Sequence, residues 1–346
     1  MRQAIVVGSV LASVALGALT SCGAHEAPAT VAVEAGVAAG LSYSIGFGPV
    51  TVQPGEEHTK CIVARLGNTL PVHIGSLHDV LSTGSHHMIV YRSNETVEQT
   101  TPFDCKPFTD TLDPTKGSTL VVSQKHDDLL SLPPGVAFTL DANQMIRLEV
   151  HYLNPGSAPI DVTATANFVT MDDASFHDEA GFLFVGDPDI KLPPHAATTL
   201  GPVFFTVPPG YEDAHFFAIT GHEHQMGTNV SVAVATSASD PGTSVYDVPG
   251  WLWSEPATVA ANPTFQIPPG GGFRFTCDWN NTSDKMVRFG ESANDEMCFF
   301  WAYYYPSQGS RVCFHSTQVG GGIDVCCPGP SLFCPLFVQA TSADGG

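Results

Sequence analysis

The chain has 346 residues, which is enough for two domains of ordinary size. Its 34 acidic residues outnumber 13 basic ones, and the net charge of −21 argues against binding to the phosphate backbone of nucleic acids. Charged residues make up only 14% of the chain, while glycine and proline contribute 33 and 27 residues. This balance favours short strands and tight turns over long helices.

The first residues have the pattern of an export signal. An uncharged apolar run from Ala4 to Leu19 is too short for a membrane span and suits a signal peptide over residues 1–22. The run ends in LTSC, which resembles a bacterial lipoprotein box with Cys22 as the lipidated residue, although a plain secretory signal has the same apolar run. Residues 23–40 are low in complexity and are predicted to form a flexible tether. We therefore expect an exported lipoprotein, anchored to a bacterial membrane and facing the periplasm or the cell surface.

The cysteine count predicts disulfides. Besides Cys22 there are eight cysteines, an even number that implies four disulfides in an exported protein. Cys61 and Cys105 lie apart from the others and form the natural first pair. Spacing alone does not fix the pairing of the remaining six, which are Cys277, Cys298, Cys313, Cys326, Cys327 and Cys334.

Alternating apolar and polar residues recur along the chain and predict an all-β fold of antiparallel sandwiches. No segment has a sustained 3.6-residue apolar period. The expected strands are residues 60–66, 86–92, 145–153, 160–169, 203–207, 214–220, 229–236, 273–279 and 299–306.

A polar stretch at residues 170–181 lacks strand character, and we place a domain boundary there. The predicted domains are residues 41–175 and residues 176–310. The cysteine-rich tail, residues 311–346, is expected to fold as a loop-rich appendage.

Three histidines of the first half could bind a metal ion. His86 and His87 are adjacent, and neighbouring residues on a regular strand face opposite sides, so both reach one ion only at a bend. Gly84 and Ser85 could supply that bend. His151 lies near the end of a predicted strand, where a lone histidine is more often a structural hydrogen-bonding group.

The heptapeptide GHEHQMG places His222 and His224 two residues apart. On a strand both side chains would point to one face, with Cα atoms about 6.5–7 Å apart, so both imidazoles could reach one ion. Taken alone, the pattern is a weak signal, and two exposed polar residues on a solvent face are the more common explanation.

Met297 precedes Cys298 in ANDEMCFFWAYYYP. A methionine in an apolar stretch is usually a core residue. Its thioether is also a soft ligand that suits Cu(I), and two histidines with one methionine would suit copper.

The order of these motifs is more specific than any one of them. The motif HHM at residues 86–88 comes first, and VHY at residues 150–152 comes next, with NP shortly after it. HxH at residues 222–224 is followed by a glycine, and EMC at residues 296–298 precedes an aromatic strand. The series resembles the ascorbate-dependent type II copper monooxygenases, the family of peptidylglycine α-hydroxylating monooxygenase and dopamine β-monooxygenase, over residues from about 61 to about 306. The resemblance implies two antiparallel, jelly-roll-like β-sandwich domains. Each would hold one copper, and the two sites would face each other across a solvent-filled cleft.

Carried over to this sequence, the resemblance implies two ligand sets. The electron-transfer copper would be bound by His86, His87 and His151. The copper that binds oxygen would be bound by the catalytic set His222, His224 and Met297. The family's bridges correspond to Cys61–Cys105 and Cys277–Cys298. Two coppers per chain are implied, with O₂ and ascorbate or an equivalent one-electron donor as co-substrates.

The sequence departs from the peptide-amidating members at the substrate. They carry a basic residue two positions before HxH, where this chain has Thr220. Their polar peptide-binding groups after the methionine are replaced by Phe299 and Trp301. With Tyr303, these residues predict a pocket for a small apolar or aromatic substrate that is hydroxylated at a C–H bond.

Three other interpretations compete with a monooxygenase. The chain could be a non-catalytic copper-binding lipoprotein for storage or sensing. It could be a zinc hydrolase, which Met297 disfavours because zinc rarely takes a thioether ligand. It could also be an adhesive β-sandwich with incidental histidines, which the order of the motifs disfavours.

Overall fold

The computed structural model describes residues 39–106, 116–318 and 322–328. The described residues all belong to one compact unit. The described residues fold almost entirely into β-strands, with one 3-10 turn at Asp173–Ser175, and contain no helix long and apolar enough to cross a membrane. The predicted all-β fold is confirmed. The predicted signal peptide, Cys22, nearly all of the tether and Cys334 lie outside the described residues.

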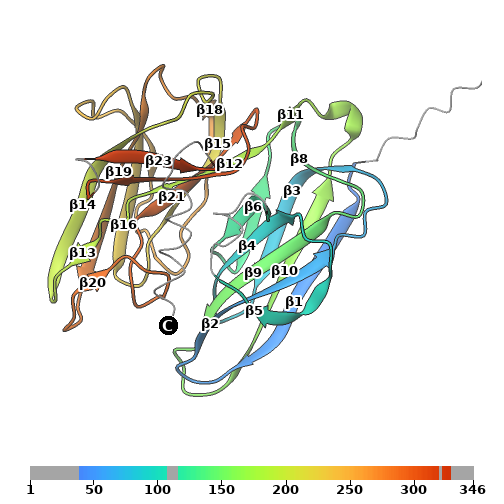
Figure 1. Cartoon of the computed structure of the whole chain (residues 1–346), viewed down its shortest axis with the longest axis horizontal. Helices are drawn as coiled ribbons and strands as arrows, with labels where there is room; N and C mark the ends of the chain where they lie inside the picture. Colours follow the sequence, from blue (N-terminus) through green and yellow to red (C-terminus); the bar gives the residue numbers. More distant parts are fainter. Residues whose placement is uncertain (1–38, 107–115, 319–321, 329–346) are drawn as a thin grey trace, which may run out of the picture. The chain divides into compact units, whose positions relative to one another are not determined.

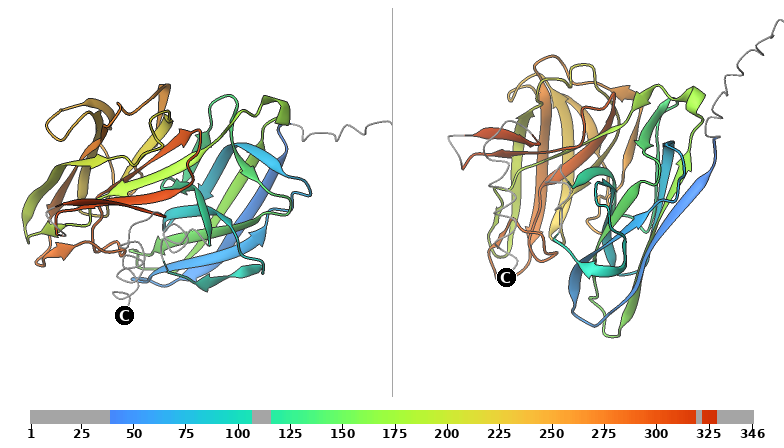
Figure 2. Two further views of the ribbon diagram at one scale, coloured as in Figure 1. Left: turned by 45° about the horizontal axis from the view of Figure 1, so that its top comes forward. Right: turned by 45° about the vertical axis from the view of Figure 1, so that its right-hand side comes forward.

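Residues 42–179 form two sheets, seen as blue to green strands in Figures 1 and 2. The first has the order β1-β10-β3-β8-β11, with β7 also pairing with β3, and the second has the order β5-β2-β9-β4-β6. In these two sheets, as far as the structure describes them, β8 and β11 pair in parallel and the other pairs are antiparallel. The strands of the first sheet are β1 (Ser42–Val52), β3 (Val72–Leu81), β7 (Asp127–Ser131), β8 (Val136–Leu140), β10 (Ile160–Thr170) and β11 (Asp178–Glu179). Those of the second are β2 (Glu57–Arg65), β4 (Ser85–Ser93), β5 (Gln99–Asp104), β6 (Gly117–Ser123) and β9 (Met145–Leu153).

Residues 181–327 form the remaining sheets. The third has the order β18-β15-β21-β12-β22-β23, the fourth has the order β14-β19-β16-β17, and β13 pairs with β20. The strands of the third sheet are β12 (Gly181–Gly186), β15 (His215–His222), β18 (Val259–Phe265), β21 (Phe299–Tyr305), β22 (Arg311–Ser316) and β23 (Ile323–Cys327). The others are β13 (Lys191–Leu192), β14 (Ala196–Thr206), β16 (Gly227–Ala235), β17 (Thr243–Asp247), β19 (Gly272–Asn281) and β20 (Val287–Arg288).

Each of the strands expected from the alternating pattern corresponds to a strand of the structure. The expectation of a loop-rich tail is wrong for the described residues after 310. Residues 311–316 pair in parallel with β12, and residues 323–327 form the next strand at the sheet edge. Alternation in RVCFHS buries Val312 and Phe314, which gives the segment a reason to join a sheet.

The third sheet is buried on both faces. On β21, the odd-numbered Phe299, Trp301 and Tyr303 belong to a first apolar core, which they share with the strands of residues 42–170. The even-numbered Phe300 and Tyr304 belong to a second core, which they share with the fourth sheet. Side chains on a strand alternate between faces, so a strand between two cores has to be apolar at almost every position. This explains the run FFWAYYY.

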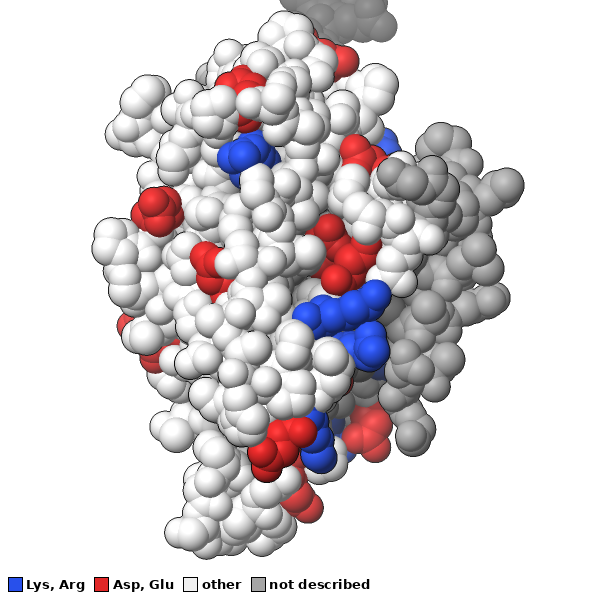
Figure 3. Space-filling model, turned by 90° about the vertical axis from the view of Figure 1, so that its left-hand side faces the viewer, with Lys and Arg blue, Asp and Glu red and all other residues white. Residues whose placement is uncertain are grey.

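One face of the molecule carries few charged side chains. Figure 3 shows one face, on which acidic and basic side chains lie next to each other and most of the surface is uncharged. On this face the negative charge of the chain does not gather in one patch.

Asp79 is a titratable residue buried in the first core. It is fully buried on β3, opposite Asp128 on β7, and accepts a 2.6 Å hydrogen bond from Ser123 Oγ. Burial raises the pKa of Asp79 to about 7, and Asp128 adds to the shift. Between the ordinary carboxyl pKa and pH 7, the folded chain therefore keeps a proton that the unfolded chain releases, so stability falls as pH rises through this window.

Replacing Asp79 by asparagine should remove this dependence. An amide oxygen can still accept the Ser123 hydrogen bond, and no ionisation is suppressed on folding. We expect Asp79→Asn to raise the free energy of unfolding at pH 8 by roughly 2–4 kcal/mol and to change it little at pH 3.5. Urea denaturation at both pH values measures this, with exposed Asp247→Asn as the control. An equal effect at both pH values would contradict the account.

Candidate metal centre

A β-bulge brings His86 and His87 to one place. Ser85 pairs with Tyr152 and His87 with the neighbouring residue His151, so His86 is the extra residue on β4. The bend suggested by the sequence is thus present. It begins at Gly84, whose φ of +92° suits glycine and where an added Cβ would lie 3.1 Å from the Leu153 carbonyl oxygen.

The bulge lets all three predicted imidazoles of the first half meet. The ring centroids of His86 and His87 are 5.1 Å apart, and those of His86 and His151 are 5.4 Å apart. His87 and His151 are direct cross-strand partners with ring centroids 5.0 Å apart. Potential ligand atoms of the three side chains lie within 4.8 Å of one another, and all three residues are buried.

His222 and His224 lie at the end of β15 and just beyond it. Their rings are perpendicular, with centroids 5.1 Å apart. His222 Nδ1 bonds to Gln124 Oε1, and His224 Nδ1 lies 3.2 Å from the Asp295 carbonyl oxygen. Both partners are acceptors, so we assign the proton of each ring to Nδ1. The lone pair then lies on Nε2, which in both residues is buried and has no hydrogen-bond partner.

The two groups of histidines are in contact. The ring centroid of His86 lies 5.8 Å from that of His222 and 5.7 Å from that of His224. His86, His222 and His224 form a second set whose potential ligand atoms lie within 4.8 Å of one another. The resemblance implied two separate sites that face each other across a solvent-filled cleft. The two groups of histidines are instead in direct contact. The facing ends of β4 and β15 pack together, and all five imidazoles are buried.

Burial keeps the imidazoles of His86, His87, His222 and His224 neutral. It lowers the pKa of His86, His87 and His222 well below the usual range, and neighbouring imidazoles add to the effect. For His224, burial lowers the pKa to about 4. A neutral imidazole offers the lone pair that a metal ion requires, so the cluster is ready to coordinate at neutral pH.

Glu57 holds His151 and the loop before Met297 together. Its Oε1 lies 2.9 Å from His151 Nε2 and accepts the Ala293 N–H at 2.7 Å, while Ser292 Oγ donates to Oε2. Burial alone would raise the pKa of Glu57, but these hydrogen bonds lower it to about 2. The carboxylate therefore accepts a hydrogen bond from the Nε2–H of His151, which leaves Nδ1 as the nitrogen of that ring that could bind a metal ion.

Met297 shares the strand face of His222. His222 pairs with Phe299, and Met297 is two residues before Phe299, so the three side chains lie on one side of the sheet. Met297 is 3% exposed and packs in the first core, while Cys298 belongs to the second. Cys298 is disulfide-bonded to Cys277 on β19, which fixes the chain next to Met297.

Glu296 ties the HxH segment to the Met297 segment. Its carboxylate accepts the N–H of His224 at 2.9 Å, the N–H of Met226 at 2.7 Å and the indole N–H of Trp279 at 2.9 Å. Burial raises the pKa of Glu296 to about 7 in spite of these hydrogen bonds. No sequence pattern indicated this role, because the hydrogen bonds to His224 and Met226 join residues about 70 positions apart.

The four residues predicted to line a substrate pocket are packed into the first core. Thr220, Phe299, Trp301 and Tyr303 are each at most 5% exposed. Phe184 stacks on both Phe299 and Trp301. A cavity of about 450 Å³ lies near the surface, but none of these four residues lines it. Its lining includes Val63, Asn94, Glu95, Val97 and Lys116.

The cysteine pairs inferred for the two ligand regions are present. Cys61 bonds to Cys105, Cys277 to Cys298, and Cys313 to Cys326. Cys327 is also disulfide-bonded. Disulfides persist in oxidising compartments, which indicates an exported protein.

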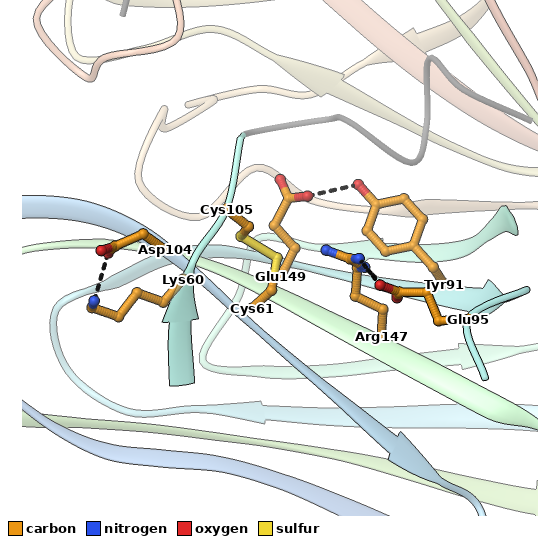
Figure 4. Close-up of a disulfide and its surroundings, with 8 residues drawn as sticks. All are labelled: Lys60, Cys61, Tyr91, Glu95, Asp104, Cys105, Arg147 and Glu149. Atoms are coloured by element: carbon orange, nitrogen blue, oxygen red, sulfur yellow. Dashed lines mark hydrogen bonds and ion pairs between the residues drawn. A yellow bond between two sulfur atoms is a disulfide. The ribbon is translucent and has the colours of Figure 1, made fainter. Parts of the chain in front are cut away.

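Figure 4 shows the Cys61–Cys105 disulfide beside a polar face of the second sheet. Arg147 and Glu149 precede His151 at two-residue spacing on β9 and so point to the same side. Polar partners satisfy them, since Tyr91 donates to Glu149 at 3.1 Å and Arg147 pairs with Glu95 through two hydrogen bonds. His151 thus lies at one end of a row of hydrogen-bonded polar groups.

Comparison with known proteins agrees with this arrangement. Residues 206–320 match the family described as copper type II ascorbate-dependent monooxygenase, C-terminal domain. The similarity to this monooxygenase family covers residues 206–320, which is less than half of the chain. The matched domain contains His222, His224 and Met297, together with the Cys277–Cys298 disulfide. Gln124, which bonds to His222, lies outside it.

Similarities to solved structures outside this family are weak in both sequence identity and TM-score. No curated protein is similar enough to this chain to count as a match. The major capsid protein P2 from bacteriophage PM2 has 8% identity and a TM-score of 0.31, over 76% of this chain and 97% of that one. PNGase F, a glycosylasparaginase from Flavobacterium meningosepticum, has 11% identity and a TM-score of 0.33, over 76% and 94%. Neither carries an argument about fold or function.

Gln124 should matter to the monooxygenase domain although it lies outside it. Its Oε1 accepts from His222 Nδ1 and its amide donates to the Gly221 carbonyl at 3.2 Å. Gln124→Leu removes both bonds at similar volume, and we expect copper affinity at the HxH motif to fall about 10–100-fold. Competition with a Cu(I) chelator measures this. The exposed Gln225→Leu is the control, and equal affinities of the two variants would refute the role.

Proposed function

We propose that this protein is a copper-dependent monooxygenase that hydroxylates a C–H bond of a small apolar or aromatic substrate. It would use O₂ and a one-electron donor such as ascorbate. The observation that carries the proposal is the set of buried Nε2 atoms of His86, His222 and His224, which have no hydrogen-bond partner and lie close together; His222 and His224 belong to the stretch that matches the monooxygenase family.

The donor set fits copper. Neutral imidazoles suit copper in either oxidation state, and the thioether of Met297 favours Cu(I). We assign His86, His87 and His151 to the electron-transfer copper, and His222, His224 and Met297 to the copper that binds oxygen. When bound, copper supplies the one-electron steps and the activation of O₂.

The residues of the chain orient the ligands and exclude water. Gln124 and the Asp295 carbonyl hold the rings of His222 and His224 with Nε2 free, and Glu57 does the same for Nδ1 of His151. The aromatic core around Trp301 keeps solvent from the same side of β21. Orientation of metal ligands by hydrogen bonds is a common means of tuning a metal site.

The substrate class follows from the lack of a cation. Thr220 stands two residues before HxH, is buried, and donates its hydroxyl proton to Thr258 Oγ1 at 2.8 Å. It offers no positive charge to a peptide carboxylate, while Phe299 and Trp301 offer apolar surface. We therefore favour small apolar or aromatic compounds over peptidylglycine. Cys22 would carry a lipid that anchors the protein on the outside of a bacterial membrane or in the periplasm.

A second function has one observation in its favour. The residues expected to line the substrate pocket are closely packed, with the Phe184 and Phe299 ring centroids only 4.8 Å apart. A copper-binding protein for storage or sensing would need no pocket there.

Ascorbate-driven oxygen uptake by the copper form, together with analysis of products, distinguishes the two functions. A monooxygenase should form about one hydroxylated product per O₂ and prefer small aromatic compounds to peptidylglycine. Oxidation of ascorbate without a hydroxylated product would refute the enzymatic proposal and support copper storage or sensing.

A further inference from the structure

We propose that His86, His222 and His224 form a metal site of their own, which holds one divalent ion such as Zn²⁺ between the two groups of histidines. This ligand set differs from both sets assigned above, because it takes one imidazole from β4 and two from the HxH motif. It uses no sulfur. The proposal does not depend on catalysis.

The three rings have the geometry of a ligand set. Their centroid separations are 5.8, 5.7 and 5.1 Å, and their potential ligand atoms lie within 4.8 Å of one another. The Nε2 atoms of all three are buried without a hydrogen-bond partner. An unpaired buried nitrogen is costly, and one ion would satisfy all three.

The surroundings already orient two of the rings. Gln124 and the Asp295 carbonyl bind Nδ1 of His222 and His224, so both Nε2 lone pairs are available. Zinc-to-nitrogen bonds of about 2.0–2.1 Å imply nitrogen separations of roughly 3.4 Å in a tetrahedral site. Small rotations of the His86 side chain would bring its Nε2 to this distance from the Nε2 atoms of His222 and His224. Trp253, whose ring centroid lies 5.4 Å from that of His86, packs against the ring that has to move.

The chemistry of the set selects the ion. Three neutral imidazoles with one open position are a common zinc arrangement, and Cu²⁺ binds such nitrogen ligands still more tightly. Zn²⁺ is the better probe because it has no redox chemistry and little affinity for the thioether of Met297. Binding of Zn²⁺ here would connect β4 to the HxH segment.

While an ion occupies the proposed site, the electron-transfer copper cannot use all three of its histidines. His86 also belongs to the set with His87 and His151. If its Nε2 binds the ion shared with His222 and His224, that nitrogen is lost to the other set. At low metal the chain would thus hold one ion on the shared set, and at two coppers per chain His86 would return to His87 and His151.

Zinc titration of the full chain tests the proposal, with calorimetry for affinity and X-ray absorption for the ligands. The wild type should bind the first Zn²⁺ with three imidazoles and no sulfur. His86→Ala and His224→Ala should each weaken this binding by more than about 100-fold, while Met297→Leu and the double variant His87→Ala/His151→Ala should leave it within about threefold. His195→Ala, at an exposed histidine, is the control.

The opposite pattern would overturn the proposal. Unchanged zinc affinity in His86→Ala would show that His86 is not a ligand, and a large loss in the double variant would place the ion on the other set. Absence of zinc binding by the wild type would also refute it. Thermal unfolding of metal-free His86→Ala shows whether a loss of zinc affinity comes from misfolding. If it does, the double variant His87→Ala/His151→Ala decides between the two sets, because only the other set needs these two imidazoles. The hydroxylation assay with copper is independent of these results.

Discussion

Replacing Met297 by leucine should stop substrate hydroxylation while leaving the fold intact. Leucine keeps the apolar volume at this 3% exposed position and removes only the sulfur. The thioether is the one soft ligand proposed, so the Cu(I) form should lose most of its affinity at the HxH motif. Loss of a hydrogen bond to a metal ligand lowers metal affinity or activity by roughly 10–100-fold. Loss of the ligand itself should lower kcat by more than that.

The control for this variant is Met145→Leu, the same exchange at a buried methionine at the start of β9. Both variants should unfold within about 1.5 kcal/mol of the wild type, because the exchange conserves volume. Only Met297→Leu should lose product formation and Cu(I) affinity. If both are retained, Met297 is a core residue and no ligand.

Removing the Cys277–Cys298 disulfide should lower stability and copper affinity together. The bond joins two buried positions 21 residues apart and connects β19 to the residue after Met297. We expect Cys277→Ala/Cys298→Ala to lower the free energy of unfolding by about 2–5 kcal/mol, measured by urea denaturation. Cu(I) affinity should fall as well, because the segment that carries Met297 loses its covalent attachment.

The matched control is the Cys313–Cys326 disulfide, which closes a shorter separation of 13 residues between β22 and β23. Its removal should also lower stability but leave Cu(I) affinity unchanged, since these edge strands carry none of the proposed ligands. Equal losses of affinity in both double variants would indicate a general loosening of the fold and would contradict a specific role for Cys277–Cys298.

The local part of the fold could be predicted from the sequence because it depends on local patterns. Two-residue alternation predicted the strands, and the adjacent pair His86–His87 required a bend, which the structure provides as a bulge after Gly84. The two-residue spacing of His222 and His224 predicted rings on one side of the chain, and their centroids are 5.1 Å apart. Each of these inferences needs only the geometry of a single strand.

The contacts between distant strands could not be predicted. Gln124 is 98 positions from His222, and Glu57 is about 235 from Ser292 and Ala293, so no spacing rule connects them. The contact between the two groups of histidines likewise depends on how β4 and β15 pack. The aromatic run after Met297 suggested a pocket, but the same pattern is required of a strand buried on both faces.

X-ray absorption of the copper(I)-loaded protein, combined with metal analysis, tests the central claim most directly. That claim is that five imidazoles and one thioether bind two coppers. The account predicts two coppers per chain and a sulfur ligand that disappears in Met297→Leu. A protein that retains no copper, or one whose copper has only nitrogen and oxygen ligands, would contradict it.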